Sequence, residues 1–269
     1  MVQRARARGF VDNNEIPLML SLETATRAGS VAISRGQSIL VSAAGDPEIS
    51  HSNDLLRLIR TALEDAKVSL REIEVFAASV GPGSFTGLRI GLATLKSFAA
   101  TLERPCVGVP TLEAIVYSTG LTGNTLAMLP AGRGEVFAQL FYVDGEGNVE
   151  ALDGPTHLAP NKLLDQLASM PSILIMAGEG AQQHAELIRE RALAEGIEYI
   201  ENLKVENMKA KLDAVAQGKR MWLLTRSSGV LAESVAISAL KRYRAGQACR
   251  PDTLRAIYVR PSDAELKEI

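Results

Sequence analysis

A glycine-rich stretch offers the clearest sign of chemistry in this chain. The stretch is SVGPGSFTGLR, residues 79–89, and it follows an apolar run and opens into a helical pattern. A strand–loop–helix junction of this kind turns unpaired backbone N–H groups and the positive end of a helix dipole outward, which suits a phosphate or a carboxylate. The stretch therefore predicts an anion-binding loop at Gly81, Gly83, Ser84, Phe85 and Thr86. The alternative is a tight turn in which the glycines and the proline serve the backbone alone.

The loop does not match the common nucleotide-binding and nucleophile motifs. Gly81 is not followed by the Gly-Lys-Ser/Thr of a P-loop, and the glycine spacing misses GxGxxG by one position. Ser84 stands in the wrong place for the serine of a GxSxG nucleophile elbow. We therefore interpret Ser84 and Thr86 as helix-capping hydroxyls.

A carboxylate lies where the first apolar strand ends. Glu23 and Thr24 follow that strand, and a carboxylate there could hold a magnesium–phosphate complex through water. A glutamate at the end of a strand also occurs without any catalytic role. The corresponding strand of the second half ends in Pro-Ala-Gly, residues 130–132, which supply no second carboxylate. Phosphoryl transfer needs several groups to neutralise developing charge, and losing one costs about 3 kcal/mol. Glu23 and Thr24 therefore predict a vestigial nucleotide site.

Composition and charge restrict the function further. The 269 residues carry a net charge of −2 and only 4% aromatic residues, which argue against a nucleic-acid surface or a base-stacking platform. Cys106 and Cys249 lie far apart and the three histidines have no metal-ligand spacing, so no metal site is predicted and a reducing, cytoplasmic compartment is favoured. No apolar run reaches the ~18 residues of a membrane span. Residues 1–15 lack the apolar core of a secretory signal and are predicted to be a disordered tail.

Apolar patterning predicts a mixed α/β order in the first half. Three strands form a meander, and a helix, a strand, the helix after the glycine loop and a short strand follow. Their expected ranges are 16–22, 30–34, 38–42, 50–66 (helix), 75–80, 86–102 (helix) and 107–109. A meander followed by a crossover gives a sheet that is partly antiparallel.

The second half repeats this order more loosely. Strands are expected at 126–129, 135–142, 149–152 and 173–176, and helices at 161–170 and from 180 to 193. VGPG at 80–83 and AGEG at 177–180 occupy matching places, which indicates either a duplication or convergence on a common strand-to-helix turn. The basic segment 201–226 predicts a solvated helix face, and a last helix is expected over 230–244. No low-complexity linker separates the halves, so we expect two packed lobes.

Together these residues resemble a known family. Residues 79–89 resemble the glycine signature of the TsaB (YeaZ) family, a bacterial subunit used in making threonylcarbamoyladenosine in tRNA. Supporting similarity lies in LETAT at 22–26, GSVA at 29–32, HS at 51–52 with two following leucines, RGEVF at 133–137 and YVRP at 258–261. The similarity covers about residues 17–262.

The resemblance implies an α/β fold of two ribonuclease-H-like (actin-like, ASKHA) lobes with mixed sheets. The first lobe would hold residues 16–112 plus 229–262, and the second, smaller lobe residues 113–228. The implied function is a non-catalytic scaffold or activator of the tRNA threonylcarbamoyladenosine synthesis complex, because the HxxxH metal site of the catalytic paralogue TsaD is missing from this sequence. We expect no tightly bound cofactor and no catalytic residue, with ATP and magnesium on partner subunits.

Partners follow from the same resemblance. We expect a TsaD-like catalytic paralogue, a TsaE-like ATPase, a homodimer when the chain is alone, tRNA only indirectly, and no membrane. The contact surface is predicted on the apolar stripe of the first helix beside the small-residue face of the helix after the glycine loop. Its residues are His51, Ser52, Leu55, Leu56, Ile59, Leu63, Gly87, Arg89, Gly91 and Leu95. The alternative is that both stripes face only their own sheet.

The chain departs from the family pattern at two places. The family usually has aspartate at the position of Glu23 and Asp-Ala-Arg at 130–132, and both departures weaken the case for a residual nucleotide site. A second hypothesis stays open, namely a stand-alone ASKHA-type ATP-dependent phosphotransferase or a glycopeptidase-like hydrolase. Its support is Glu23 and the glycine loop.

Overall fold

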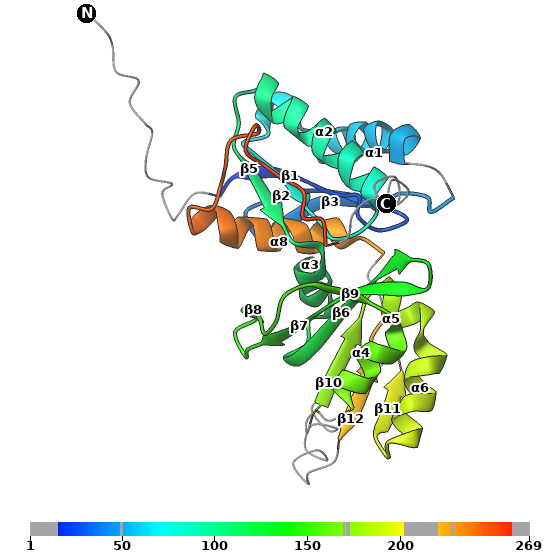
Figure 1. Cartoon of the computed structure of the whole chain (residues 1–269). Coiled ribbons are helices and arrows are strands. Elements are labelled where there is room, and N and C mark those ends of the chain that lie inside the picture. The colour runs from blue at the N-terminus through cyan, green and yellow to red at the C-terminus, as the bar shows by residue number, and fades with distance from the viewer. Residues whose placement is uncertain are drawn as a thin grey trace, which may run out of the picture.

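Two mixed sheets and the helices that cover them make up the protein (Figure 1). The computed structural model describes residues 16–48, 51–168, 170, 173–201, 220–226 and 229–259. The strands are β1 Leu18–Glu23, β2 Ser30–Arg35, β3 Ser38–Ala44, β4 Val75–Ser79, β5 Cys106–Val109, β6 Gly123–Gly132, β7 Glu135–Val143, β8 Val149–Ala151, β9 Thr156–Leu158, β10 Ile173–Ala177, β11 Glu198–Glu201 and β12 Met221–Leu224. The helices are α1 His51–Ala66, η1 Leu70–Glu72, α2 Phe85–Thr101, α3 Thr111–Thr119, α4 Pro160–Leu167, α5 Glu179–Gln183, α6 Ala185–Ala194 and α8 Leu231–Arg244.

The two sheets share one strand order. The first runs β3-β2-β1-β4-β5, with β1 antiparallel to β2 and parallel to β4. The second runs β11-β12-β10-β6-β7-β8, with β6 antiparallel to β7 and parallel to β10. Strands β6, β7, β8, β10 and β12 thus stand where β1, β2, β3, β4 and β5 stand in the first sheet. The predicted α/β fold of two ribonuclease-H-like lobes with mixed sheets is confirmed.

We call the first sheet with α1 and α2 the first lobe, and the second sheet with α4, α5 and α6 the second lobe. The residue boundaries predicted for the two lobes stay a prediction. The predicted tail 1–15, most of the basic segment (202–219) and residues 260–269 lie outside the described residues. None of the helices that the structure describes is long and apolar enough to cross a membrane.

Strand β1 is buried along its whole length because both faces of its sheet are covered. Leu18, Leu20 and Leu22 belong to the core beneath α1 and α2, and Met19 belongs to the core on the opposite face. Successive strand residues point to opposite faces, so one short strand contributes to two cores. A strand that is buried on both faces is a continuous apolar run, which is why its position is evident in the sequence.

The second of these cores joins the two lobes. It contains Val75 of β4 from the first sheet, Ala127 and Leu129 of β6 from the second, and Leu112 of α3 and Val235 of α8 between them. Figure 1 shows α8 under the first sheet and α3 between α8 and the second sheet. The outer face of the second sheet has a separate core with α4 and α6. The lobes therefore share buried side chains rather than meeting at a polar surface.

Polar contacts fix α8 in this position near both ends. At its start the N–H of Ala232 donates to Ser30 Oγ at 2.9 Å. Further along, Ser238 Oγ donates to Glu113 Oε1 of α3 at 2.6 Å, and the Arg242 guanidinium pairs with the same carboxylate. Because the Glu113 side chain is only 14% exposed, this ion pair has little access to solvent.

Two elements of the interior differ from the sequence expectations. No element is predicted over 111–119, where the structure has α3, because most faces of this helix are apolar and buried and no amphipathic period stands out. The solvated helix face predicted for 201–226 is wrong at β12, where all four residues are buried. The helix expected from 180 to 193 is two helices, α5 and α6, which are divided at His184.

The Glu113 pair gives a test of the join between the lobes. Glu113→Ala leaves the Arg242 guanidinium without its anion, so we expect the free energy of unfolding to fall by about 2–3 kcal/mol. Urea unfolding followed by the fluorescence of Trp222, the single tryptophan, measures the change. The matched control is Asp252→Ala, which removes an exposed ion pair with Arg250 and should change stability by less than about 0.5 kcal/mol. Equal effects of the two substitutions would contradict this account.

Candidate functional site

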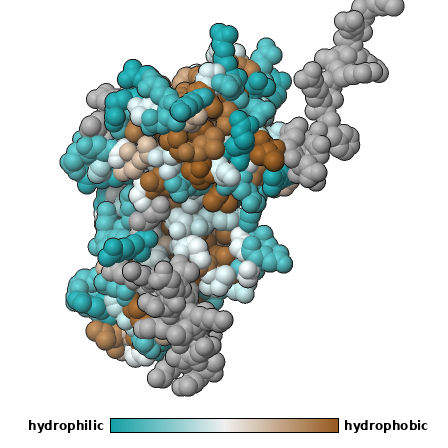
Figure 2. Space-filling view, turned by 180° about the vertical axis from the view of Figure 1, so that it is seen from behind, coloured by the Kyte–Doolittle hydropathy of each residue, from teal (hydrophilic) through white to brown (hydrophobic). Residues whose placement is uncertain are grey.

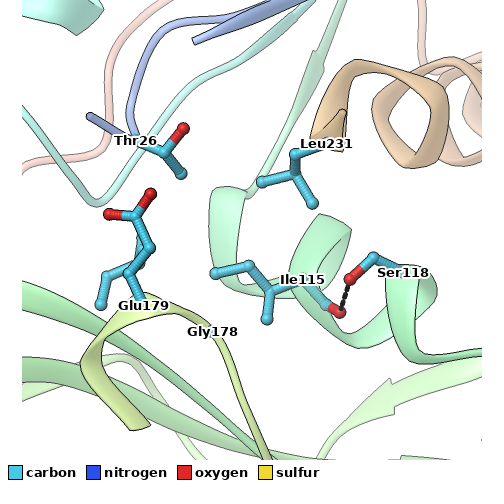
Figure 3. Close-up of a pocket in the computed structure, with 7 residues that line it drawn as sticks. Thr26, Ile115, Ser118, Gly178, Glu179 and Leu231 are labelled. Atoms are coloured by element: carbon cyan, nitrogen blue, oxygen red, sulfur yellow. Dashed lines mark hydrogen bonds between the residues drawn. The ribbon is translucent and has the colours of Figure 1, made fainter. Parts of the chain in front are cut away.

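A small cavity lies between the lobes, near the ends of β1 and β10 (Figure 3). Figure 3 shows the Glu179 carboxylate turned toward Thr26, with Ile115 of α3 and Leu231 of α8 on the apolar side. Its other lining residues are Ser118, Leu129 and Gly178. The cavity thus lies where two strand ends from different lobes meet the helices of the shared core.

The volume of this cavity is about 30 Å³. That volume holds a few water molecules, at roughly 10–15 Å³ each by the same measure. Pockets that bind small ligands and cofactors occupy roughly 300–1,000 Å³, which is at least ten times more. This cavity is therefore too small for a nucleotide.

Glu23, the predicted centre of a vestigial nucleotide site, forms hydrogen bonds within the turn that follows it. Its side chain is fully buried at the end of β1. The N–H groups of Ala25 and Thr26 donate to Oε1 at 2.5 and 2.8 Å, and the Thr26 hydroxyl donates to Oε2 at 2.5 Å. Both carboxylate oxygens therefore accept from the chain itself, and Glu23 caps the turn that follows β1.

Burial controls the charge of the two carboxylates near this cavity. Burial raises the pKa of Glu23 above the usual glutamate value, and the negative charge of Glu179 raises this pKa further. Hydrogen bonds from Thr26 and Ala25 act in the opposite direction. Burial likewise raises the pKa of Glu179, against a backbone hydrogen bond from Arg27 and the charge of that residue. Two acids with raised pKa values thus lie close together at the junction of the lobes.

Thr24, the second residue of the predicted nucleotide site, packs beneath α2. It is buried, and a Cβ added at Gly91 of α2 would lie 2.1 Å from its hydroxyl oxygen. Only glycine lets the helix approach the turn this closely. The small-residue face of α2 that we predicted for a partner is therefore occupied, at Gly91, by the first lobe itself.

The glycine loop between β4 and α2 also uses its donors internally. The N–H of Gly81 donates to the Thr111 hydroxyl at 3.1 Å, and the N–H of Ser84 donates to the Ala25 carbonyl at 2.8 Å. Ser84 caps α2 as predicted, since its hydroxyl accepts from the N–H of Gly87 at 3.1 Å. These contacts remove three of the donors that an anion would need, and anion binding by the loop stays a prediction.

The C-terminal segment covers the same loop. The N–H of Ile257 donates to the Val80 carbonyl at 2.7 Å, and a Cβ at Gly81 would lie 2.4 Å from the Ile257 carbonyl oxygen. Phe85 lies at the start of α2, and its ring centroid is 5.2 Å from that of Tyr258. The guanidinium carbon of Arg89 lies 3.9 Å from the centroid of the Phe85 ring. The loop is therefore packed between the turn after β1 and the end of the chain.

Burial also removes several residues from the predicted partner surface. Leu55, Ile59 and Leu95 lie in the core of the first lobe, and Gly87 and Gly91 are buried in α2. They cannot contact a partner while this core is intact, because α1 and α2 turn these side chains toward their own sheet. The remaining members are the exposed Leu56 and Arg89, the half-buried Leu63, and His51 and Ser52, whose side chains lie outside the described part of α1.

Sequence reasoning missed three residues of the site. Thr26 and Glu179 face the cavity, and Thr111 holds the glycine loop from the start of α3. The matching of AGEG at 177–180 with VGPG at 80–83 was a signal for Glu179, since both follow the equivalent strand of their lobe. Thr26 and Thr111 carry no such signal, because their roles arise only when distant segments meet.

Comparison with known proteins gives a family match over most of the chain. The family model TsaD, described as tRNA N6-adenosine threonylcarbamoyltransferase, matches residues 47–254. The tRNA threonylcarbamoyladenosine biosynthesis protein TsaB of Escherichia coli is 28% identical over 179 residues, which are 65% of this chain and 77% of that protein. An uncharacterized protein of Mycobacterium tuberculosis is 31% identical over 180 residues, 64% of this chain and 76% of that protein.

Solved structures agree in fold. The structure of YeaZ from Pseudomonas aeruginosa superimposes with a TM-score of 0.66 and 21% identity, and it covers 90% of this chain and 99% of that one. At this identity the likeness concerns the fold alone. It supports the assignment of the two lobes made from the strand order.

The raised pKa of Glu23 predicts a pH-dependent contribution to stability. A raised pKa means that the folded state holds its proton more tightly, so this contribution is present below about pH 4.5 and is lost as the pH rises through the folded-state pKa. We expect the free energy of unfolding of the wild type, relative to Glu23→Gln, to decrease as the pH rises from 4.5 to 8. Urea unfolding across this range measures the difference.

A second substitution separates charge from hydrogen bonding. Glu23→Ala leaves the N–H groups of Ala25 and Thr26 without their acceptor, and we expect it to cost about 2–4 kcal/mol at every pH. Glutamine keeps an acceptor oxygen and should avoid most of that loss. Parallel pH profiles for the wild type and Glu23→Gln would show that the carboxyl group has an unshifted pKa.

Proposed function

We propose a function for this chain from one premise: it belongs to the TsaB (YeaZ) family, within the wider family that the TsaD model describes. The proposed role is that of a non-catalytic subunit in making threonylcarbamoyladenosine in tRNA. In this role the chain binds and activates a TsaD-like catalytic paralogue. The name of the Escherichia coli relative supports the pathway, and the site geometry supports the absence of chemistry in this subunit.

The main observation behind this proposal is that the Glu23 carboxylate forms hydrogen bonds within its own turn. A catalytic carboxylate must present an oxygen to a metal or a substrate, whereas Glu23 is fully buried and both of its oxygens accept hydrogen bonds from the turn at 2.5–2.8 Å. The neighbouring cavity of about 30 Å³ is too small for a nucleotide. We infer that the chain keeps the two-lobed fold for its shape and leaves ATP and magnesium to partner subunits.

The outward side of α1 and α2 supports a docking role. Leu56 is 59% exposed near the middle of α1, and Leu63 lies two turns further along the same stripe. Ile90 and Phe98 lie eight residues apart on α2 and are only partly buried. Figure 2 shows hydrophobic side chains gathered on the first-lobe part of the face that it displays. Contiguous apolar surface on a soluble protein marks sites of protein contact.

The partner that we propose for this surface is a TsaD-like paralogue with two helices of its own. Such a four-helix contact would bury about 1,600 Å² in total, the size of an ordinary stable interface. A homodimer through the same surface when the chain is alone, a TsaE-like ATPase in the assembly, indirect contact with tRNA and a cytoplasmic location complete the proposal.

Leu56→Asp tests the surface. We expect the variant to fold and to bind the TsaD-like paralogue of the same organism at least about tenfold more weakly, because a buried aspartate at the contact would lose its solvation. Size-exclusion chromatography and calorimetric titration of the two proteins measure the loss. The matched control is Leu193→Asp on α6 of the second lobe, where leucine is 70% exposed. Unchanged binding by Leu56→Asp would reject the surface. Ile59→Asp is unsuitable because it would disrupt the core.

Titration with magnesium-ATP decides between this role and an independent enzyme. We expect the isolated chain to give no binding heat at millimolar nucleotide, because the site between the lobes is closed. The alternative, a stand-alone phosphotransferase or hydrolase, is supported by the two carboxylates near the cavity. Tight binding by the isolated chain, with turnover that Glu23→Gln abolishes without loss of folding, would establish the alternative.

A further inference from the structure

The two cysteines of the chain lie opposite each other on neighbouring backbone segments. Cys106 begins β5 at the edge of the first sheet, and Cys249 follows α8 and pairs with it as an isolated antiparallel bridge. The N–H of each residue donates to the carbonyl of the other, both at 2.8 Å. They are the only two cysteines in the sequence, so every thiol that the protein has lies in this pair.

The backbone pairing places the two cysteine side chains next to each other. Residues that exchange both hydrogen bonds in an antiparallel pair have Cα atoms about 5.5 Å apart and side chains on the same face. Disulfides span Cα separations of roughly 4.4–6.8 Å, which includes that value. They also need Cβ atoms about 3.5–4.5 Å apart, so the Cβ atoms of this hydrogen-bonded pair, about 5.5 Å apart in a regular ladder, must approach by roughly 1 Å when the bond forms. Both cysteine side chains also pack against the same core, the one beneath α1 and α2.

The two thiols differ in access. Cys106 is fully buried, and burial raises the pKa of its thiol to about 12, with the nearby Cys249 adding to the rise. Cys249 is half-buried and lines a groove of about 780 Å³, together with Arg104 and Arg250. A small oxidant can therefore reach Cys249 from solvent, whereas Cys106 is buried and does not line the groove.

We propose that Cys106 and Cys249 are a modification site, at which a peroxide converts the dithiol into a reversible intrachain disulfide. The Cys249 sulfur attacks one peroxide oxygen, the O–O bond breaks, and a sulfenic acid forms while the other oxygen leaves as water. The Cys106 sulfur then attacks the sulfenic sulfur, an S–S bond forms, the S–O bond breaks, and the second oxygen leaves as water with the last thiol proton. Two thiols lose two electrons in total, and one hydrogen peroxide is reduced to two water molecules.

The bond would tie the C-terminal segment to the first sheet. Beyond Cys249 this segment places Leu254 in the core, accepts a hydrogen bond from Lys96 Nζ at the Leu254 carbonyl at 3.2 Å, and covers the glycine loop at Ile257. Thiols in a reducing compartment stay reduced until oxidant rises. The disulfide would therefore link the C-terminal segment, which packs on the glycine loop, to the first sheet only under oxidative conditions.

Alkylation counts test the proposal on the full chain. Reduced protein should take two alkyl groups under denaturing conditions, one for each cysteine. After treatment with hydrogen peroxide it should take none, run as a monomer without reductant, and weigh less by two hydrogen atoms, and dithiothreitol should restore both thiols. The midpoint of thermal unfolding should rise by about 5–10 °C on oxidation, because the crosslink closes a long loop of the unfolded chain.

Cys249→Ser and Cys249→Ala are the control variants, since this half-buried position tolerates change better than the buried Cys106. In both variants peroxide should leave the unfolding midpoint unchanged and Cys106 open to alkylation. Two reactive thiols after peroxide treatment of the wild type would overturn the proposal. So would disulfide-linked dimers as the main product, or sulfinic acid at Cys249 with Cys106 still free.

Discussion

One buried core, shared by both sheets and filled by α3 and α8, is the constraint on which the rest of this structure depends. Val75 and Leu129 come from different lobes and belong to the same cluster, with Val235 of α8 among its members. Glu113 and Arg242 add an ion pair between the two helices. Because this core lies directly beside the ends of β1 and β10, it brings the Thr26 turn and the start of α5 together and leaves little space between them.

The residues at the junction of the two lobes make their polar contacts within the chain. Glu23 satisfies the donors of its own turn, Thr24 packs against Gly91, and Ser84 caps α2. Each residue type suits phosphate chemistry, yet each is already engaged in a backbone contact. Residue type and spacing therefore identify the location of a site, and the hydrogen-bond partners decide whether it is available. The proposed docking function follows from that distinction, because the exposed apolar residue of the predicted partner surface is Leu56 on α1.

The sequence predicts much of the fold and little of the site. β1 and β4 are apolar runs, and the VGPG turn is a local feature, so both are evident from neighbouring residues. α3 is not evident, since a helix buried on most sides has no polar face to mark its period. β12 is not predicted because basic residues flank its four apolar residues in the sequence. The predicted roles of Leu55 and Ile59 fail for a related reason: a stripe on a helix shows that something is buried, and only tertiary structure shows against what. The pairing of Cys106 with Cys249 likewise depends on contacts far apart in sequence.

The position of α8 has a consequence for synthesis of the protein. This helix, Leu231–Arg244, covers a face of the sheet that begins at Leu18, and its first turn is held by Ser30. While the ribosome is still making the second lobe, that face of the first sheet has no cover, and its apolar residues, including Met19 and Ala77, remain open to water or to a chaperone. The first lobe can therefore complete its folding only after α8 has emerged from the ribosome.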